Sequence, residues 1–345
     1  KVKFGEADLM KIKSMIGGIV GLMVAFASTT FAQDNYYGGK TVTVMIGHKP
    51  GGSFDLYAQL TASHLGRFLP GAPNVVVEHR PGGGGSKATA YFYAAAPTDG
   101  TVIGIFPETN AHAQLLFPKK AKWDMTKMPY IGSYAPVNPV FVVRKDAPAV
   151  TIDEMKKTEI AVGCTGFTSQ SCQMPNAMIQ FAGMKFKIVS GYKGSAGFVD
   201  AMTKGEVDLV SMAWNTWRSK QKDKLESGNY VPVLQGGLGR NPELPDLPLL
   251  QEAVDDPFAK EVLSWIGSGD RIGRALIAPP GVDLERLSEL KTAFQTMVQD
   301  SDFIADANKR MALLIPAGGD ELDALTESIL AADTKIVETA KEAYE

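Results

Sequence analysis

The sequence lacks the residue patterns on which most enzyme active sites depend. It has four histidines, and no two of them are spaced as a metal-binding pair on a helix. The stretch PGGGGSK at 81–87 lacks the Gly-Lys-Ser/Thr ending of a phosphate-binding loop, and there is no Gly-x-Ser-x-Gly nucleophile motif. We therefore expect no catalytic residues, no cofactor and no metal site, although a triad of residues scattered along the chain stays open.

The chain also lacks a basic excess and, beyond its first 32 residues, a long hydrophobic run. It carries 35 Lys and Arg against 38 Asp and Glu, a net charge of −3. This balance argues against a nucleic-acid-binding protein, which needs basic residues gathered on one face. With 345 residues, 45% of them hydrophobic, the chain has room for one large or two medium globular domains.

The N-terminal region has the pattern of a secretory signal peptide. Lys11 and Lys13 precede an apolar run from Met15 to Ala27, which is too short to span a bilayer comfortably. The small residues Thr30 and Ala32 then suit cleavage after Ala32. We expect a signal peptide over 10–32, rather than an anchored helix, and a mature protein in the periplasm. Residues 1–9 are an upstream extension or a cloning remnant and are left out of the fold.

Only two cysteines are present, Cys164 and Cys172, and both lie beyond the expected cleavage site. In an oxidising compartment two cysteines this close can pair. The alternative is two buried free thiols. A disulfide is favoured slightly, because the segment between them begins as a loop.

Short β-type runs alternate with helical patterns along most of the chain. This alternation predicts parallel sheets covered by helices. The expected strands are 41–46, 75–78, 101–106, 140–143, 160–163, 186–189, 207–212 and 231–234. The expected helices are 55–69, 86–95, 171–181, 196–204 and 257–264, followed by three helical segments from 283 onward.

The segment HKPGGSFD at 48–55 raises the possibility of an anion site. It follows a strand and opens a helix, whose first N–H groups have no partners within the helix and favour an anion. Glycine permits a close approach of the backbone, and Lys49 would add positive charge. Asp55 would repel an anion, so we expect it to cap the helix or hold the loop. A plain strand–turn–helix corner capped by Ser53 is the alternative.

Two later segments have the same design. CTGFTSQ at 164–170 follows a strand and supplies hydroxyl groups that can cap a helix, and SGYKGSAG at 190–197 also joins a strand to a helix. Ligands of open α/β sheets bind in such turns, at the carboxyl ends of the strands. The three turns together favour a binding site over three unrelated corners.

Four segments, in this order, resemble the tripartite tricarboxylate transporter receptor family, also called Bug-type periplasmic solute-binding proteins. They are VMIGHKPGGSFDLYAQLTASHLGRFLPG, VVVEHRPGGGGSKATAYFYAAAPTDGTVIGIF, GYKGSAGFVDAMTKGEVDLV and ALIAPPGVDLERLSELKTAFQTMVQDSDF. The resemblance covers nearly the whole mature chain, from about residue 39 to the end.

The resemblance implies an α/β fold of two domains, the type II-like periplasmic-binding-protein fold, with the ligand in the cleft between them. We expect domain one over 39–135 plus 275–345, domain two over 139–268, and hinges near 140–143 and 274–279. The family delivers a small organic carboxylate to integral membrane permease subunits, and we expect a monomer that binds no nucleic acid and is not an enzyme. The alternatives are a signalling receptor of the same fold and, less favoured, a secreted α/β enzyme.

The resemblance also implies which residues bind the ligand, mostly through backbone amides, hydroxyls and waters. The implied contacts in the first domain are Lys49, Pro50, Gly51, Gly52, Ser53, Phe54, Asp55, Thr109 and Asn110. Those in the second domain are Thr165, Gly166, Phe167, Thr168, Ser169, Tyr192, Lys193, Gly194, Trp214 and Asn215.

This chain departs from the family's pattern at the implied site. Many members have a small residue where Phe54 stands and an apolar pair where His48 and Lys49 stand. Phe54, Phe167, Trp214 and Trp217 could form aromatic walls suited to an aromatic or bulky carboxylate. For Trp217 core packing is the favoured interpretation, and for Phe167 both interpretations stay open.

Overall fold

The computed structural model describes residues 35–344, which form two mixed α/β lobes. The expected signal peptide over 10–32 and the extension before it lie outside the described residues. Most predicted elements are present, and the strand Thr41–Ile46 and the helix Ser86–Ala95 begin and end where the sequence predicts. In the described residues, no helix is long and apolar enough to cross a membrane.

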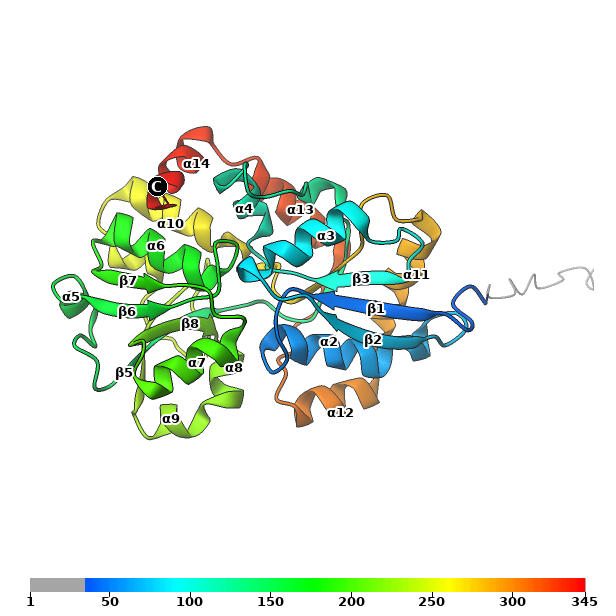
Figure 1. The fold of residues 1–345 in the computed structure, drawn as a ribbon, viewed down its shortest axis with the longest axis horizontal. Helices are drawn as coiled ribbons and strands as arrows, with labels where there is room; N and C mark the ends of the chain where they lie inside the picture. The colour runs from blue at the N-terminus through cyan, green and yellow to red at the C-terminus, as the bar shows by residue number, and fades with distance from the viewer. Residues whose placement is uncertain (1–34, 345) are drawn as a thin grey trace, which may run out of the picture. The chain divides into compact units, whose positions relative to one another are not determined.

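The first lobe is built on a six-stranded sheet in the order β11-β4-β10-β3-β1-β2. Its strands are β1 (Thr41–Ile46), β2 (Asn74–His79), β3 (Val102–Ile105), β4 (Tyr130–Ser133), β10 (Ala275–Ile277) and β11 (Ala317–Gly318). Its helices are α2 (Ser53–His64), α3 (Ser86–Ala95), α4 (Asn110–Leu116), α11 (Leu284–Met297), α12 (Ser301–Lys309) and α13 (Gly319–Leu330). The last helix, α14 (Thr334–Lys341), packs against both α4 and α10 (Pro257–Gly267), a helix of the second lobe. Figure 1 shows α2 on one side of this sheet and α3 on the other, which is how right-handed crossovers cover a parallel sheet.

The second lobe is built on a five-stranded sheet in the order β7-β6-β8-β5-β9. Its strands are β5 (Pro139–Arg144), β6 (Ile160–Gly163), β7 (Phe186–Val189), β8 (Leu209–Ala213) and β9 (Tyr230–Gln235). Its helices are α5 (Ile152–Met155), α6 (Gln170–Ala182), α7 (Ser195–Lys204), α8 (Trp214–Lys220), α9 (Lys222–Glu226) and α10 (Pro257–Gly267). Figure 1 shows α6 and α7 on opposite sides of this sheet.

The sheets are mixed, whereas the alternating pattern predicts parallel ones. In the first sheet β10 runs antiparallel to β3 and β4, and in the second β5 runs antiparallel to β8 and β9. β5 and β10 are the strands that the chain enters just after passing from one lobe to the other, and β11, which also runs antiparallel to β4, follows later in the first lobe. The sequence pattern does not reveal the reversal, because a buried strand has the same apolar composition in either direction.

Two short segments carry the chain between the lobes, 134–138 on the way out and 270–274 on the way back. They are hydrogen-bonded to each other, with Tyr134 N donating to Arg274 O and Arg274 N donating to Ala135 O, both at 3.0 Å. Val140–Val143, expected near a hinge, lies inside β5, between β8 and the edge strand β9 of the second sheet.

The C-terminal tail forms four α-helices rather than the three segments expected. Aspartates cap three of them: the side chains of Asp283, Asp300 and Asp333 accept hydrogen bonds from the first N–H groups of α11, α12 and α14. The tail also reaches the second lobe, where Tyr344 Oη donates to Gln173 O at 3.1 Å.

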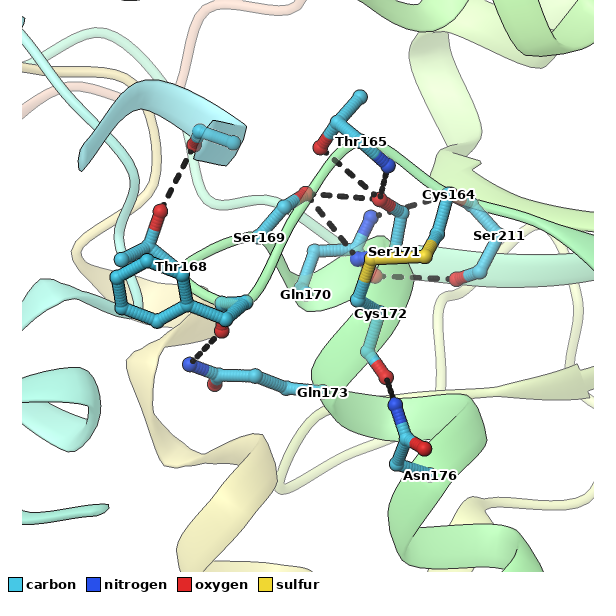
Figure 2. Close-up of a disulfide and its surroundings, with 12 residues drawn as sticks. Cys164, Thr165, Thr168, Ser169, Gln170, Ser171, Cys172, Gln173, Asn176 and Ser211 are labelled. Carbon is cyan, nitrogen blue, oxygen red and sulfur yellow. Dashed lines mark hydrogen bonds between the residues drawn. A yellow bond between two sulfur atoms is a disulfide. The ribbon is translucent and has the colours of Figure 1, made fainter. Parts of the chain in front are cut away.

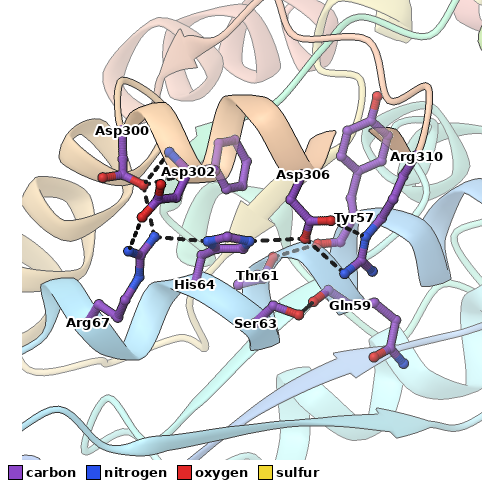
Figure 3. Close-up of polar contacts among 11 residues, drawn as sticks. Tyr57, Gln59, Thr61, Ser63, His64, Arg67, Asp300, Asp302, Asp306 and Arg310 are labelled. Atoms are coloured by element: carbon purple, nitrogen blue, oxygen red, sulfur yellow. Dashed lines mark hydrogen bonds and ion pairs between the residues drawn. The ribbon is translucent and has the colours of Figure 1, made fainter. Parts of the chain in front are cut away.

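A polar cluster fixes α12 against α2 (Figure 3). His64 Nε2 lies 3.0 Å from Asp306, and Arg67 donates to Asp300 at 2.8 Å and to Asp302 at 3.1 Å. The cluster therefore holds the tail to the helix that follows the glycine-containing turn of β1.

Candidate functional site

The three turns singled out in the sequence meet where the lobes touch. Lys49 N in the first turn donates to Lys193 O in the third at 3.1 Å. The Thr168 hydroxyl in the second turn donates towards Gly83 O and Gly84 O, at 3.1 and 3.0 Å. The Thr109 hydroxyl donates in turn to Thr168 O. The turns that the sequence placed at the ends of separate strands therefore form one surface.

A small cavity lies among these turns, with a volume of about 40 Å³. Residues at the N-termini of three helices line it: Gly52 and Ser53 of α2, Ser169 and Gln170 of α6, Gly194 and Ser195 of α7. Unpaired N–H groups and the helix dipole make each of these ends favourable for negative charge. Three such ends on one cavity give it the electrostatics of an anion site.

Asp55 holds the first turn rather than facing the cavity. Gly51 N donates to its Oδ2 at 2.8 Å, and His79 Nε2 lies 2.8 Å from its Oδ1. Burial alone would raise the pKa of Asp55, but these hydrogen bonds bring it below its usual value. Gly51 has a φ of 97°, in the left-handed region that favours glycine, so the turn needs glycine there.

A disulfide between Cys164 and Cys172 closes the second turn (Figure 2). Inside it, Ser171 Oγ lies 3.4 Å from Thr165 Oγ1 and 2.8 Å from Ser169 Oγ. Thr165, Ser169 and Ser171 all line the cavity. The disulfide thus frames a set of hydroxyl groups next to the α6 N-terminus.

The cavity wall contains a buried ion pair that was not predicted from the sequence. Arg274 Nη1 lies 2.7 Å from Glu108 Oε2, and their side chains are only 6% and 5% exposed. Arg274 Nε also donates to Ser53 Oγ at 3.0 Å, next to the α2 N-terminus. Arg274 was predicted only as part of a hinge. The sequence did hold a signal, because each charged residue lies next to an apolar strand. Arg274 directly precedes β10, and Glu108 follows β3 just after Pro107.

Two aromatic contacts pack Phe54 into the same wall. Its ring stacks on the His48 ring, with centroids 4.2 Å apart, and the Arg274 guanidinium carbon lies 4.0 Å from its centroid. Burial, and then the charge of Arg274, lower the pKa of His48 to about 3. His48 is therefore neutral near pH 7, and its contribution to the cavity is a polar ring without charge.

Not every residue implied by the resemblance reaches this cavity. Lys49, Gly52, Ser53, Phe54, Thr165, Ser169 and Gly194 line it, whereas Pro50, Gly51, Asp55, Thr109, Asn110, Gly166, Phe167, Thr168, Tyr192 and Lys193 do not. Some of the residues that do not line the cavity make contacts with other parts of the first lobe. Gly166 packs against Gly83 and Gly84, and Asn110 donates to Thr89 Oγ1 at 3.2 Å.

The expected aromatic walls are mostly elsewhere. Trp217 is fully buried and donates to Val140 O, which confirms core packing. Phe167 packs edge-on against Phe117. Trp214 lines a separate, larger groove of about 1200 Å³ together with Asn215 and Asp270. Of the four aromatic residues, only Phe54 contributes to the small cavity.

This chemistry suits binding rather than catalysis. The cavity joins helix N-termini, hydroxyl groups and one guanidinium, which are the groups that hold a carboxylate or another small anion. In residues 35–344 no group of three or more His, Cys, Asp or Glu side chains could hold a metal ion.

Solved structures of periplasmic binding proteins share this fold. BugD is 21% identical, with a TM-score of 0.68, over 88% of this chain and 97% of its own. MatC (Rpa3494) from Rhodopseudomonas palustris with bound malate is 20% identical, with a TM-score of 0.68, over 87% and 98%. R. palustris Rpa4515 with adipate is 21% identical, with a TM-score of 0.67, over 87% and 97%. BugD is described as a periplasmic binding protein, and no curated protein matched the sequence.

The model of the family described as "Tripartite tricarboxylate transporter family receptor" matches residues 62–312, well over half of the chain. That span begins within α2 and ends after α12, so it includes the second sheet, four strands of the first sheet and the second and third turns, whereas β1, β11 and the first turn at 48–55 lie outside it. The expectation from the sequence is confirmed: this chain belongs to the tripartite tricarboxylate transporter receptor family of solute-binding proteins.

Proposed function

We propose that this protein captures a small organic carboxylate in the periplasm and delivers it to the integral membrane subunits of a tripartite tricarboxylate-type transporter. One observation carries the proposal: three helix N-termini and the Arg274 guanidinium converge on one small cavity. A guanidinium matches carboxylates and phosphates in planar hydrogen bonding, and the family match favours a carboxylate.

The charge of the cavity wall favours an anion of modest size. Lys49 adds a cation at the edge, Glu108 is paired with Arg274, and His48 is neutral near pH 7. The family match and the bound malate and adipate in structures of similar fold agree with a carboxylate ligand.

The volume of the cavity indicates that the lobes separate before a ligand enters. About 40 Å³ is far below the roughly 300–1,000 Å³ of typical small-molecule sites. The direct contacts between turns, such as that of Lys49 N with Lys193 O, are those of a closed arrangement. We propose that the paired segments 134–138 and 270–274 act as the hinge, with lobe boundaries close to those expected from the sequence. Ligand binding then stabilises the closed form through its greater affinity for it.

Thermal unfolding of the mature protein from Gln33 tests the proposal. The panel holds di- and tricarboxylates, hydroxy acids, acidic amino acids, aromatic acids and uncharged amide analogues. A ligand at a hundred times its dissociation constant adds roughly 2.7 kcal/mol to the free energy of unfolding. We expect stabilisation by one or more carboxylates and none by the matching amides.

Stabilisation by uncharged analogues alone would contradict the anion site. For the transporter partner, the test is uptake of the identified acid by membrane vesicles that contain the permease subunits. Uptake should require the mature binding protein and fail with a receptor whose cavity is blocked.

A further inference from the structure

The Arg274–Glu108 pair stands out because stability alone does not account for it. Its members are 6% and 5% exposed, so both charges have lost most of their hydration. The attraction within a buried ion pair often only offsets this loss, and apolar residues of similar size would stabilise the fold as well or better. A pair kept at the wall of a ligand cavity therefore calls for a role in binding.

The sheet fixes the positions of both residues. Glu108 follows β3 and Arg274 precedes β10, and these strands are antiparallel neighbours with Ile105 opposite Leu276. The guanidinium is held further by Ser53 Oγ and by the Phe54 ring. Its plane is thus set before any ligand arrives, which lowers the entropy cost of binding.

Each member of the pair keeps unused hydrogen-bonding capacity. The hydrogen bonds within residues 35–344 engage Arg274 Nε and Nη1 and Glu108 Oε2, and leave Arg274 Nη2 and Glu108 Oε1 without a partner. Both residues line the cavity, and neither atom is among the fully occluded polar atoms that lack partners. The wall therefore presents a cationic donor and an anionic acceptor side by side.

We propose that Arg274 and Glu108 make this site specific for small carboxylates that carry a hydrogen-bond donor, a hydroxyl or an ammonium group, next to the carboxylate. This inference rests on the proposed function and names its ligand class. The ligand carboxylate accepts from Arg274 Nη2, while its neighbouring O–H or N–H donates to Glu108 Oε1.

The same geometry disfavours a plain dicarboxylate. A ligand without the donor leaves Glu108 Oε1 buried and unpaired, or brings a second carboxylate against it. A site built to hydrogen-bond a polar group rejects analogues that lack it, because its own buried group is then left without a partner. Adipate, bound in one structure of similar fold, is a ligand of this disfavoured kind.

Three four-carbon acids of matched size test the inference: succinate, malate and aspartate. Calorimetry on the wild-type mature protein gives their dissociation constants directly. We expect malate or aspartate, or both, to bind at least about tenfold more tightly than succinate. Tighter malate would identify a hydroxyl as the donor, and tighter aspartate an ammonium.

The variant Glu108→Gln removes the charge of the acceptor and keeps its size. We expect the preference over succinate to shrink to within about threefold, with tighter succinate binding because Arg274 loses its competing carboxylate. Glu252→Gln is the control, since Glu252 also pairs with an arginine, Arg240, but neither residue lines the cavity. Circular dichroism and unfolding without ligand establish that the variants are folded.

Two outcomes would overturn the inference while leaving the proposed function intact. One is succinate binding as tightly as malate and aspartate to the wild type. The other is a Glu108→Gln variant that is folded and keeps the full preference. If no carboxylate of the wider panel binds, the proposed function fails and the inference fails with it.

Discussion

At the scale of single residues, close contact between the lobes depends on glycines, as Gly166 and Gly52 illustrate. A Cβ added at Gly166 would lie 2.5 Å from the carbonyl carbon of Gly83 and 2.6 Å from Gly84 N. These are backbone atoms of the other lobe and cannot rotate away. At Gly52 the nearest atom is the Ser195 hydroxyl, 2.8 Å away, which can turn aside.

Gly166→Ala should therefore weaken ligand binding by opposing closure. We expect the affinity to fall at least about tenfold, equivalent to about 1.4 kcal/mol, with a much smaller effect for Gly52→Ala. Calorimetry with the best ligand measures both. Gly318→Ala is the control, because nothing lies within 4 Å of its added Cβ and its φ is −76°. Unchanged affinity in Gly166→Ala would mean that the bound state does not bring these turns together.

Asp270, in the wall of the larger groove, should leave a signature in the pH dependence of stability. Burial raises its pKa to about 7, with the Arg271 N–H and charge lowering it in part and the charge of Glu108 raising it. Between its unfolded pKa near 3.8 and pH 7, the folded state holds a proton that the unfolded state has released. Its contribution to stability is therefore fully present below about pH 4 and is lost as the pH rises to 7.

Asp270→Asn removes this titration. The free energy of unfolding of the variant, minus that of the wild type, should rise by about 1.4 kcal/mol per pH unit between about pH 4 and 7 and stay constant above. Urea denaturation at pH 4, 5, 6, 7 and 8 measures the difference. Asp255→Asn, which removes an exposed carboxylate, is the control. Parallel curves for wild type and Asp270→Asn would rule out the raised pKa.

At the scale of elements, the turn between β6 and α6 combines two functions. The disulfide between Cys164 and Cys172 closes a loop with a sequence separation of eight. Hydroxyl groups of this turn line the cavity, and that of Thr168 donates to Gly84 O in the other lobe. The covalent link therefore orders a segment that has little apolar burial of its own.

The double variant Cys164→Ser/Cys172→Ser should lose both stability and affinity. A loop of this length corresponds to about 2.5 kcal/mol in the chain-entropy model. We expect a loss of that order in the free energy of unfolding and weaker ligand binding, because the freed turn must be ordered on closure. Wild-type protein treated with dithiothreitol should behave the same way. A stable variant with unchanged affinity would show that the packing of the turn suffices.

Helices and strands could be predicted from the sequence where the local residue pattern determines them. They could not be predicted where pairing with distant parts of the chain determines them. The strands Ile160–Gly163 and Phe186–Val189 were predicted with their observed ends because apolar runs bounded by polar turns define them. β10 and β11 were missed because three and two residues are too few for a periodic pattern. The glycine-containing turns marked the candidate site for the same local reason, whereas Arg274 and Glu108 meet only through the pairing of β3 with β10.

At the scale of the whole molecule, affinity depends on the balance between open and closed forms as much as on contacts with the ligand. Polar contacts between the lobes include Lys49 N to Lys193 O at 3.1 Å, Asn215 Nδ2 to Tyr57 Oη at 3.2 Å and Trp265 Nε1 to Ile329 O at 3.2 Å. Each neutral hydrogen bond contributes only about 1 kcal/mol, so small changes at the contact shift the balance. The apparent dissociation constant is the intrinsic one divided by the fraction of molecules in the competent form.

Thr168→Val tests this balance without touching the cavity wall. The change removes the hydroxyl that donates to Gly83 O and Gly84 O across the lobes and keeps the β-branched shape. We expect about fivefold weaker binding, as one lost hydrogen bond of about 1 kcal/mol predicts, together with a larger radius of gyration of the ligand-free protein by X-ray scattering. Thr203→Val is the matched control, because its hydroxyl bonds Val199 O and Tyr230 within the second lobe. If both variants lose affinity equally, the effect comes from the substitution itself and closure does not depend on the Thr168 contact.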